Sequence, residues 1–252
     1  MDKTKIFAHR GASGYAPENT LEAFALAVSQ KADGIELDVQ LTRDGVPVVI
    51  HDETIDRVTS KTGYVKDYTL KELKKLTVME KQFPAYPSSK IPTLEEVLDA
   101  VKASGIWVNI ELKTGIYWYP EIEQKVAQIV QKCDMEQRVI YSSFNHYSIQ
   151  KIKQIVPEAE TAYLYSDVIW NVTDYAKNTK VDGIHPAVYH IKMADFLNEY
   201  IKSGLNVRVW TVNDTTDMKW LIETGVTAVI TNYPDVAVKI REQRENQNHA
   251  GK

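Results

Sequence analysis

Five short polar clusters interrupt or end apolar, strand-like runs of this sequence. A buried strand has no structural use for a charge at such a place, because an unpaired charge is costly to bury. Polar side chains at the ends of several strands instead indicate an active site assembled at one rim of the fold. The clusters are His9-Arg10-Gly11, Glu36-Leu37-Asp38, His51-Asp52, Glu111-Leu112-Lys113 and Trp210-Thr211-Val212-Asn213.

Three acidic side chains in these clusters have the spacing and the chemistry of a cation site. Glu36 and Asp38 are two residues apart, so both point to the same face of a strand, and Glu111 belongs to a later strand-like run. Three carboxylates without a nearby cysteine are hard oxygen ligands, which favour one divalent cation, Mg²⁺ or Ca²⁺, over Zn²⁺. The alternative is that Arg10 and Lys113 neutralise the acids by ion pairing and that no metal binds.

Two histidines, His9 and His51, each follow a strand-like run and are expected at the same rim. A pair of imidazoles can share general-base and general-acid work at neutral pH. Arg10 and Lys113 add positive charge there, which suits an anion such as a phosphate. Trp210 either packs within the fold or forms an apolar wall for the organic part of a substrate.

The elements that must position these clusters alternate between strands and helices. Strand-like runs occur near residues 5–8, 34–39, 46–50, 106–112, 138–142, 159–164, 181–184, 206–212 and 226–230. Helical patterns occur at residues 19–30, 93–103, 121–132, 145–155, 168–178, 191–202, 214–222 and 234–244. Asn19 with Glu22, and Thr93 with Glu96, have the spacing of a capping box, and Asp214 stands at an N-cap position.

This alternation predicts an α/β fold with a parallel sheet. Roughly eight strand-helix units in about 250 residues match a closed (β/α)8 TIM-type barrel. The alternative, an open doubly wound sheet, usually feeds its first strand into a G-x-G-x-x-G loop, and the segment after Ala8 lacks that spacing. We therefore expect one barrel domain over residues 1–243 and a polar tail over residues 244–252.

A long connection breaks the regular pattern after the second barrel strand. From residue 52 to residue 92, about forty residues separate a strand from its helix, where a few would be enough. This insertion is expected to be either a lid or substrate-selecting element over the site, or a surface excursion that does not contact substrate.

The composition excludes several classes of function. The chain has 30 Lys and Arg against 34 Asp and Glu, without a basic cluster, so neither a nucleic acid nor an anionic membrane is an expected partner. The single cysteine, Cys133, excludes an internal disulfide. No apolar run is long enough for a signal peptide, a membrane helix or another stable membrane anchor. We expect a cytoplasmic enzyme.

Together these residues resemble the glycerophosphodiester phosphodiesterase family, in its bacterial cytoplasmic type. The resemblance covers nearly all of residues 1–240. Besides the five clusters, the matching segments are Pro17-Glu18-Asn19-Thr20, Thr42-Arg43-Asp44-Gly45, Asn109-Ile110, Ser143-Phe144 and Thr231-Asn232-Tyr233-Pro234-Asp235.

The resemblance implies a metal-dependent hydrolase that cleaves small-molecule glycerophosphodiesters into an alcohol and sn-glycerol 3-phosphate. A cyclic phosphate intermediate is implied as well, with direct attack by water as the simpler competitor. By position, the implied metal ligands are Glu36, Asp38 and Glu111, the acid-base pair is His9 and His51, the phosphate-facing residues are Arg10 and Lys113, and the residue beside glycerol is Trp210.

Two other functions are compatible with the same residues. One is a lysophospholipase D-type phosphodiesterase, which would need a long apolar groove. The other is a catalytically silent barrel that binds phosphodiesters or a protein partner, which the intact acids and histidines argue against. The head group, the choice of cation and the presence of a homo-oligomer are left open by the sequence.

Overall fold

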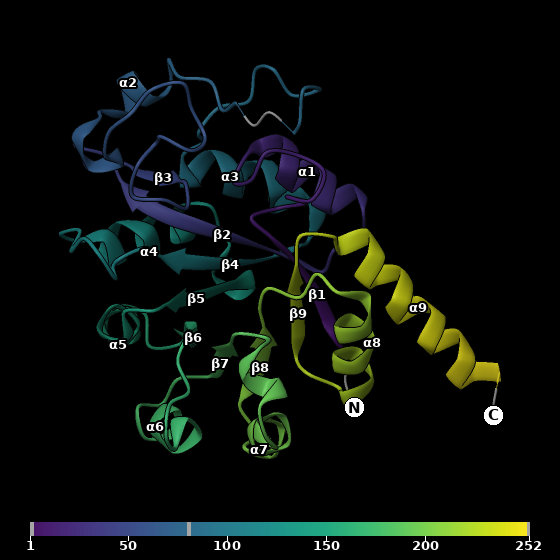
Figure 1. Ribbon diagram of the computed structural model, residues 1–252. Helices are drawn as coiled ribbons and strands as arrows, with labels where there is room; N and C mark the ends of the chain where they lie inside the picture. Colours follow the sequence, from purple (N-terminus) through teal and green to yellow (C-terminus); the bar gives the residue numbers. More distant parts are fainter. Residues whose placement is uncertain (1–2, 80–81, 251–252) are drawn as a thin grey trace.

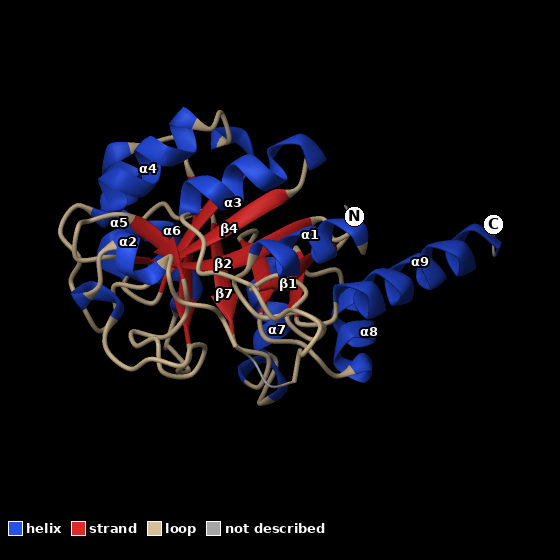
Figure 2. Ribbon diagram, turned by 90° about the horizontal axis from the view of Figure 1, so that it is seen from above, coloured by secondary structure: helices blue, strands red, loops and turns tan. Residues whose placement is uncertain are grey.

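Eight of the strand-like runs form one closed parallel barrel in the computed structural model, which describes residues 3–79 and 82–250. The barrel strands are β1 (Lys5–His9), β2 (Gly34–Leu41), β4 (Trp107–Leu112), β5 (Val139–Ser143), β6 (Glu160–Tyr165), β7 (Gly183–Pro186), β8 (Asn206–Val209) and β9 (Ala228–Thr231). β1 pairs in parallel with both β2 and β9, so the sheet closes on itself. The predicted TIM-type barrel is therefore confirmed, and its strands lie inside a ring of helices (Figure 2).

Helices lie between successive barrel strands, and α9 follows the last strand; together they surround the barrel (Figure 2). They are α1 (Leu21–Ser29), α3 (Leu94–Val101), α4 (Ile122–Lys132), α5 (His146–Ile155), α6 (Val172–Asn178), α7 (Phe196–Lys202), α8 (Thr215–Thr224) and α9 (Pro234–Ala250). The expected polar tail continues α9 as helix as far as Ala250, and α9 projects from the barrel (Figure 1). The last two residues of that tail, 251–252, lie outside the described residues. No described helix has the length and apolar character needed to cross a membrane.

Helix capping follows the sequence at two places and departs from it at one. Thr93 and Glu96 form a capping box at α3, and Asp214 caps α8 through the N–H groups of its first turn. The predicted box of Asn19 with Glu22 is wrong, because Thr20 is the N-cap of α1 and accepts from the Ala23 amide. Asn19 is one residue too early, and its side chain turns to the barrel interior instead.

The alternating faces of the strands divide the core into an outer and an inner part. Residues such as Ile6, Ala8 and Leu37 point outward and pack in the large core beneath the helices. Phe7 belongs to a separate small cluster inside the barrel, with Ile140, Ala228 and Ile230. This apolar cluster fills the middle of the barrel, so the polar side chains gather at the carboxyl ends of the strands.

The run at residues 46–50 is not a barrel strand. It forms β3 (Pro47–Val49), which pairs antiparallel with β2 as the return arm of a hairpin. The insertion that follows contains α2 (Leu70–Leu73) and lies beside β2 and β3 (Figure 1). It has a small core of its own, made by Val48, Ile50, Ile55, Val58, Val65, Leu73, Val78 and Ile91.

Candidate active site

The turn after β1 aims a backbone amide at the acidic cluster. Arg10 and Gly11 both have positive φ, of 56° and 82°, so the chain leaves the strand sharply. A Cβ at Gly11 would lie 2.7 Å from Ala23 of α1, which requires glycine at this close approach. The turn directs the Arg10 N–H to Glu36 Oε2 at 2.9 Å.

The three predicted metal ligands meet at the carboxyl ends of β2 and β4. Asp38 and Glu111 are register partners in these neighbouring strands, and Glu36 precedes Asp38 by two residues on the same face. One carboxylate oxygen from each lies within 4.8 Å of the others. Their residues are only 4%, 1% and 8% exposed, so water screens the three charges poorly.

Two cations offset part of this charge. Lys113 Nζ lies 3.0 Å from Glu111 Oε1, and Arg10 Nε lies 3.4 Å from Asp38 Oδ2. Burial alone would raise the pKa of Asp38, but Arg10 leads the positive groups that outweigh it and hold that pKa at about 2. The pKa of Glu111 is raised, because burial outweighs the attraction of Lys113. Glu36 has its pKa raised well above the ordinary value by burial, Asp38 and Glu111.

The donor set fits a hard divalent cation. Among the described residues, no side-chain cation forms an ion pair with Glu36, because Arg10 bonds Glu18 and Asp38 instead. Asp38 Oδ1 is buried and accepts no hydrogen bond within the described chain. The ion-pair alternative therefore accounts for Asp38 and Glu111 but leaves Glu36 uncompensated. A cation among the three carboxylates would satisfy both Glu36 and Asp38 Oδ1.

His9 is held as a neutral imidazole beside this cluster. Its Nδ1–H donates to Asn232 Oδ1 at 2.7 Å, which leaves Nε2 as the acceptor nitrogen. Burial, together with the positive charge of Arg10, lowers the pKa of His9 to about 4. A neutral ring with one acceptor nitrogen has the protonation state of a general base.

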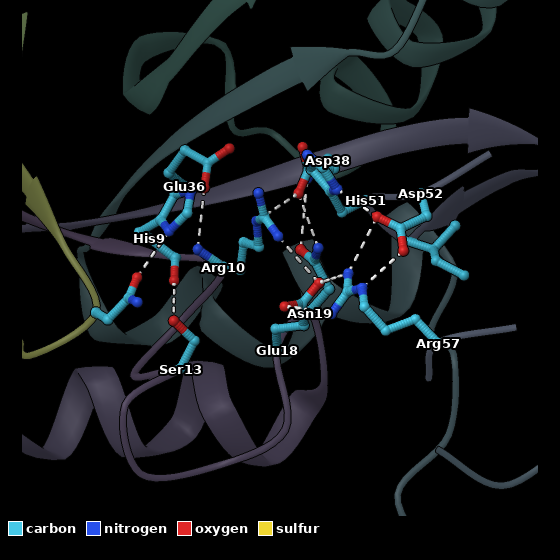
Figure 3. Close-up of polar contacts among 12 residues, drawn as sticks. His9, Arg10, Ser13, Glu18, Asn19, Glu36, Asp38, His51, Asp52 and Arg57 are labelled. Carbon is cyan, nitrogen blue, oxygen red and sulfur yellow. Dashed lines mark hydrogen bonds and ion pairs between the residues drawn. The ribbon is translucent and has the colours of Figure 1, made fainter. Parts of the chain in front are cut away.

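His51 has the opposite setting, because a carboxylate faces its ring. Its Nδ1 lies 2.6 Å from Asp52 Oδ1, and Arg57 Nε donates to the other oxygen of Asp52 at 2.7 Å (Figure 3). The hydrogen bond from His51, followed by Arg57, holds the pKa of Asp52 well below its usual range. A carboxylate at Nδ1 fixes the orientation of the imidazole ring, as the Asp of a catalytic triad does for its His.

The backbone of His51 is fixed from β2. Gln40 continues the inward face of Glu36 and Asp38, and its Nε2 lies 2.9 Å from the His51 carbonyl and 2.6 Å from that of Asp52. Tyr119 donates to Gln40 Oε1 at 2.8 Å and so fixes the orientation of the amide. β2 thus positions two of the acids directly and, through Gln40, the backbone of the histidine that follows the β2–β3 hairpin.

These groups surround a cavity of about 190 Å³. Its lining residues are His9, Arg10, Glu36, His51, Asn109, Glu111, Phe144, Leu164, Trp210 and Ile230. Trp210 donates from Nε1 to the His185 carbonyl at 2.7 Å, and its ring meets Phe144 edge to face with centroids 5.5 Å apart. Trp210 therefore lines the cavity and also packs against the small cluster inside the barrel, so both alternatives for this residue stay open.

The structure brings the predicted residues together and adds others. Asp38 and Lys113 lie directly beside Glu111, but neither of them is among the residues that line the cavity. Asp52 and Phe144 were part of recognised motifs but had no predicted role. Arg57, Gln40, Leu164 and Ile230 carried no signal, since an arginine in an insertion resembles a solvated charge and an aliphatic strand residue resembles core.

Comparison with known proteins gives a consistent result. Residues 9–236 match the model of the glycerophosphoryl diester phosphodiesterase family. A glycerophosphodiester phosphodiesterase of Caldanaerobacter subterraneus is 41% identical over 238 residues, covering 94% of this chain and 98% of that protein. A second one, from Bacillus altitudinis, is 44% identical over 246 residues and covers 95% and 99%.

Solved structures agree with the sequence comparison. A phosphodiesterase of Oleispira antarctica, determined in complex with the product sn-glycerol 3-phosphate, superimposes with a TM-score of 0.88 at 28% identity. The match covers 95% of this chain and 97% of that one. A glycerophosphodiester phosphodiesterase of Agrobacterium tumefaciens has a TM-score of 0.81 at 30% identity, over 93% and 98% of the two chains.

Proposed function

Because this chain belongs to the glycerophosphoryl diester phosphodiesterase family, we propose that its barrel cavity is the site at which glycerophosphodiesters are hydrolysed to sn-glycerol 3-phosphate and an alcohol. One observation carries the assignment of the site. Two histidines with different hydrogen-bond partners, an amide for His9 and a carboxylate for His51, share the cavity with Glu36, a buried carboxylate that forms no ion pair with a side-chain cation of the described residues. A silent binding barrel needs neither feature.

Glu36, Asp38 and Glu111 would hold one divalent cation, Mg²⁺ or Ca²⁺, through their oxygens. When bound, such an ion supplies Lewis-acid stabilisation of the charge that develops on the phosphoryl oxygens. Arg10 lines the cavity and directs further positive charge at the same oxygens, while Lys113 holds Glu111 in place at 3.0 Å. The substrate phosphate is thereby positioned between the two histidines.

His9 acts as the base in the first step and His51 as the acid. His9 Nε2 takes the proton of the free glycerol 2-hydroxyl as that oxygen forms its bond to phosphorus. His51, protonated and stabilised by Asp52, gives its proton to the alcohol oxygen as the phosphorus–oxygen bond to the head group breaks. The hydrogen bonds to Asn232 and Asp52 keep the two rings in these tautomers.

The product of this first step is a cyclic phosphate and a free alcohol. Water then attacks phosphorus, and the two histidines exchange roles, with His51 accepting the proton of water and His9 returning one to the 2-oxygen. Direct attack by water on the diester is the competing route. A substrate whose 2-hydroxyl is replaced by a methoxy group separates them, because only direct attack can proceed without that hydroxyl.

A second substrate class is favoured by one observation. Large apolar side chains remain exposed in the loops after β4, β5 and β6, whose strands or following loops also line the cavity. They are Ile116, Trp118, Phe144, Val168 and Trp170. These side chains could accommodate an acyl chain beyond the glycerol, which supports a lysophospholipase D-type activity as the second candidate.

One assay tests the function and its metal dependence. The purified protein is given glycerophosphocholine, glycerophosphoethanolamine, glycerophosphoglycerol or lysophosphatidylcholine, each with EDTA, Mg²⁺ or Ca²⁺. We expect release of glycerol 3-phosphate from the glycerophosphodiesters and loss of turnover in EDTA. The His51→Ala variant should lose about 10²- to 10⁴-fold in kcat and still bind the metal in calorimetry. Unchanged turnover in this variant would overturn the role of His51.

A cytoplasmic location stays a prediction from the sequence.

A further inference from the structure

An arginine of the insertion connects the loop after β1 with the segment after the β2–β3 hairpin. Arg57 binds Asp52 through Nε at 2.7 Å and Nη2 at 3.1 Å, and it binds Glu18 through Nη1 at 3.0 Å and Nη2 at 2.6 Å. Glu18 also accepts from Arg10 Nη1 at 3.1 Å, and Asp52 accepts from His51. Figure 3 shows this row of side chains running from Arg10 to His51.

Arg57 holds Asp52 and Glu18 together, and we call these three residues the clamp. A guanidinium that binds two carboxylates through a fixed fork of N–H groups restricts both of them, whereas a single point charge would not. Asp52 is held at both oxygens and therefore presents Oδ1 to His51 in one orientation. The His51 side chain is 30% exposed, and Asp52 is the hydrogen-bond partner of its ring in the described part of the chain.

We propose that Arg57 is a positioning residue, which orients His51 through Asp52 and couples it to Arg10 through Glu18. This role rests on the function proposed above, in which His51 is the acid and Arg10 faces the phosphate. Arg57 reaches no cavity-lining residue other than through these two carboxylates in the contacts of the described chain. Arg57 thus connects His51, the proton donor after the β2–β3 hairpin, to Arg10, the phosphate-binding residue in the loop after β1.

The competing explanation is that Arg57 only fastens the insertion to the barrel. Arg43 provides a matched control, because it also tethers this region, through the Asp67 carbonyl at 2.8 Å and Glu72 at 3.1 Å. The side chains of Arg57 and Arg43 are similarly exposed, at 46% and 56%. Among the described residues, the Arg43 side chain forms no hydrogen bond with His51, Asp52 or Glu18, so its removal loosens the tether and leaves the contacts of Arg57 in place.

The test compares Arg57→Ala, Arg57→Lys and Arg43→Ala with the wild-type enzyme. Arg57→Ala should lower kcat by at least about tenfold with little change in KM, since the misplaced group acts in the transition state. Methylguanidinium added to the assay should restore part of that loss, and Arg57→Lys should fall between Arg57→Ala and the wild type. Arg43→Ala should keep its kcat. The ¹⁵N signals of the His51 ring should change in Arg57→Ala and not in Arg43→Ala.

The coupling to Arg10 has its own measurement. If Glu18 acts through Arg57, the two substitutions are not independent. The fold-loss in kcat of the Glu18→Gln/Arg57→Ala double variant should then be smaller than the product of the fold-losses of the two single variants. An undiminished kcat in Arg57→Ala, or a loss equal to that of Arg43→Ala, overturns the positioning role. A wild-type enzyme without activity on any of the phosphodiesters overturns the proposed function itself, and the positioning role falls with it.

Discussion

The two walls of the catalytic cavity come from different parts of the barrel and are built differently. The wall formed by β1, β2, β4 and the hairpin after β2 contributes His9, Arg10, Glu36, His51 and Glu111. The opposite wall is formed after β5 and β8 and within β6 and β9. It contributes Phe144, Leu164, Trp210 and Ile230.

The difference between these walls lies in how strictly each position is specified. Each group of the charged wall has named partners at hydrogen-bond distance, such as Asn232 for His9 and Asp52 for His51. The residues of the apolar wall make van der Waals and aromatic contacts instead, such as the edge-to-face pair of Phe144 and Trp210. A change on the first wall should therefore remove chemistry, whereas a change on the second should weaken binding by an amount related to area.

The largest effect should follow from Glu36→Gln on the charged wall. Removal of this carboxylate takes one ligand from the cation site, so we expect kcat to fall by more than about 10³-fold and calorimetric binding of Mg²⁺ and Ca²⁺ to weaken. Glu123→Gln is the matched control, because Glu123 is also buried, at 1% exposure, but binds Ser148 and Lys151 outside the barrel. Equal metal affinity in the two variants would contradict the assignment of Glu36.

A smaller effect should follow from Phe144→Ala on the apolar wall. The Phe144 ring lines the cavity, and loss of an aromatic contact to the substrate of about 0.5–1.5 kcal/mol corresponds to a rise in KM of roughly 2- to 12-fold with kcat nearly unchanged. Tyr147→Ala is the control, because Tyr147 is 81% exposed in α5 and does not line the cavity. If Phe144→Ala lowered kcat as strongly as Glu36→Gln, the division between the two walls would be wrong.

The smallest effect concerns the support behind Leu164. His146 donates from Nε2 to the Leu164 carbonyl at 3.0 Å and stacks on Tyr163 at 3.9 Å, and burial lowers its pKa despite that hydrogen bond. Because the folded pKa lies below the unfolded value of about 6.5, the unfolded chain binds more protons as pH falls through that value, and stability decreases.

The measurement is the thermal midpoint Tm at pH values of about 8 and about 5.5, on either side of the ordinary histidine pKa. His146→Gln should lose less Tm on acidification than the wild type, by at most about 4 °C. An identical decrease in both proteins would exclude His146 as a source of the pH dependence.

The sequence predicted much of the fold because local periodicity survives in the tertiary structure. The helix at residues 93–103 and the strand at residues 34–39 were found within a few residues, since each shows a complete apolar pattern and its own boundary signals. The run at residues 46–50 was correctly predicted to be a strand, but the sequence did not show which strand it pairs with. A short apolar strand has the same pattern in a barrel and in a hairpin, and only its pairing with β2 distinguishes them.

Asn19 illustrates the same limit at a helix end. Asn19 and Thr20 are adjacent and both are good N-caps, so local chemistry does not choose between them. The choice came from Asp38, which is distant in sequence and takes the amide of Asn19 at 2.8 Å. A long-range hydrogen bond to a buried carboxylate outweighed a capping bond available to the neighbouring residue.

By itself, the sequence determined which chemistry is present. The residue types and the spacing of two along β2 fix two carboxylates on one face, because side chains alternate on every strand. Only the tertiary structure decided the partners: the Arg10 side chain pairs with Asp38 and Glu18 rather than with Glu36, and Arg57 pairs with Glu18 across 39 positions of the chain. Such contacts depend on loop conformation and on the closure of the barrel, which no local period encodes.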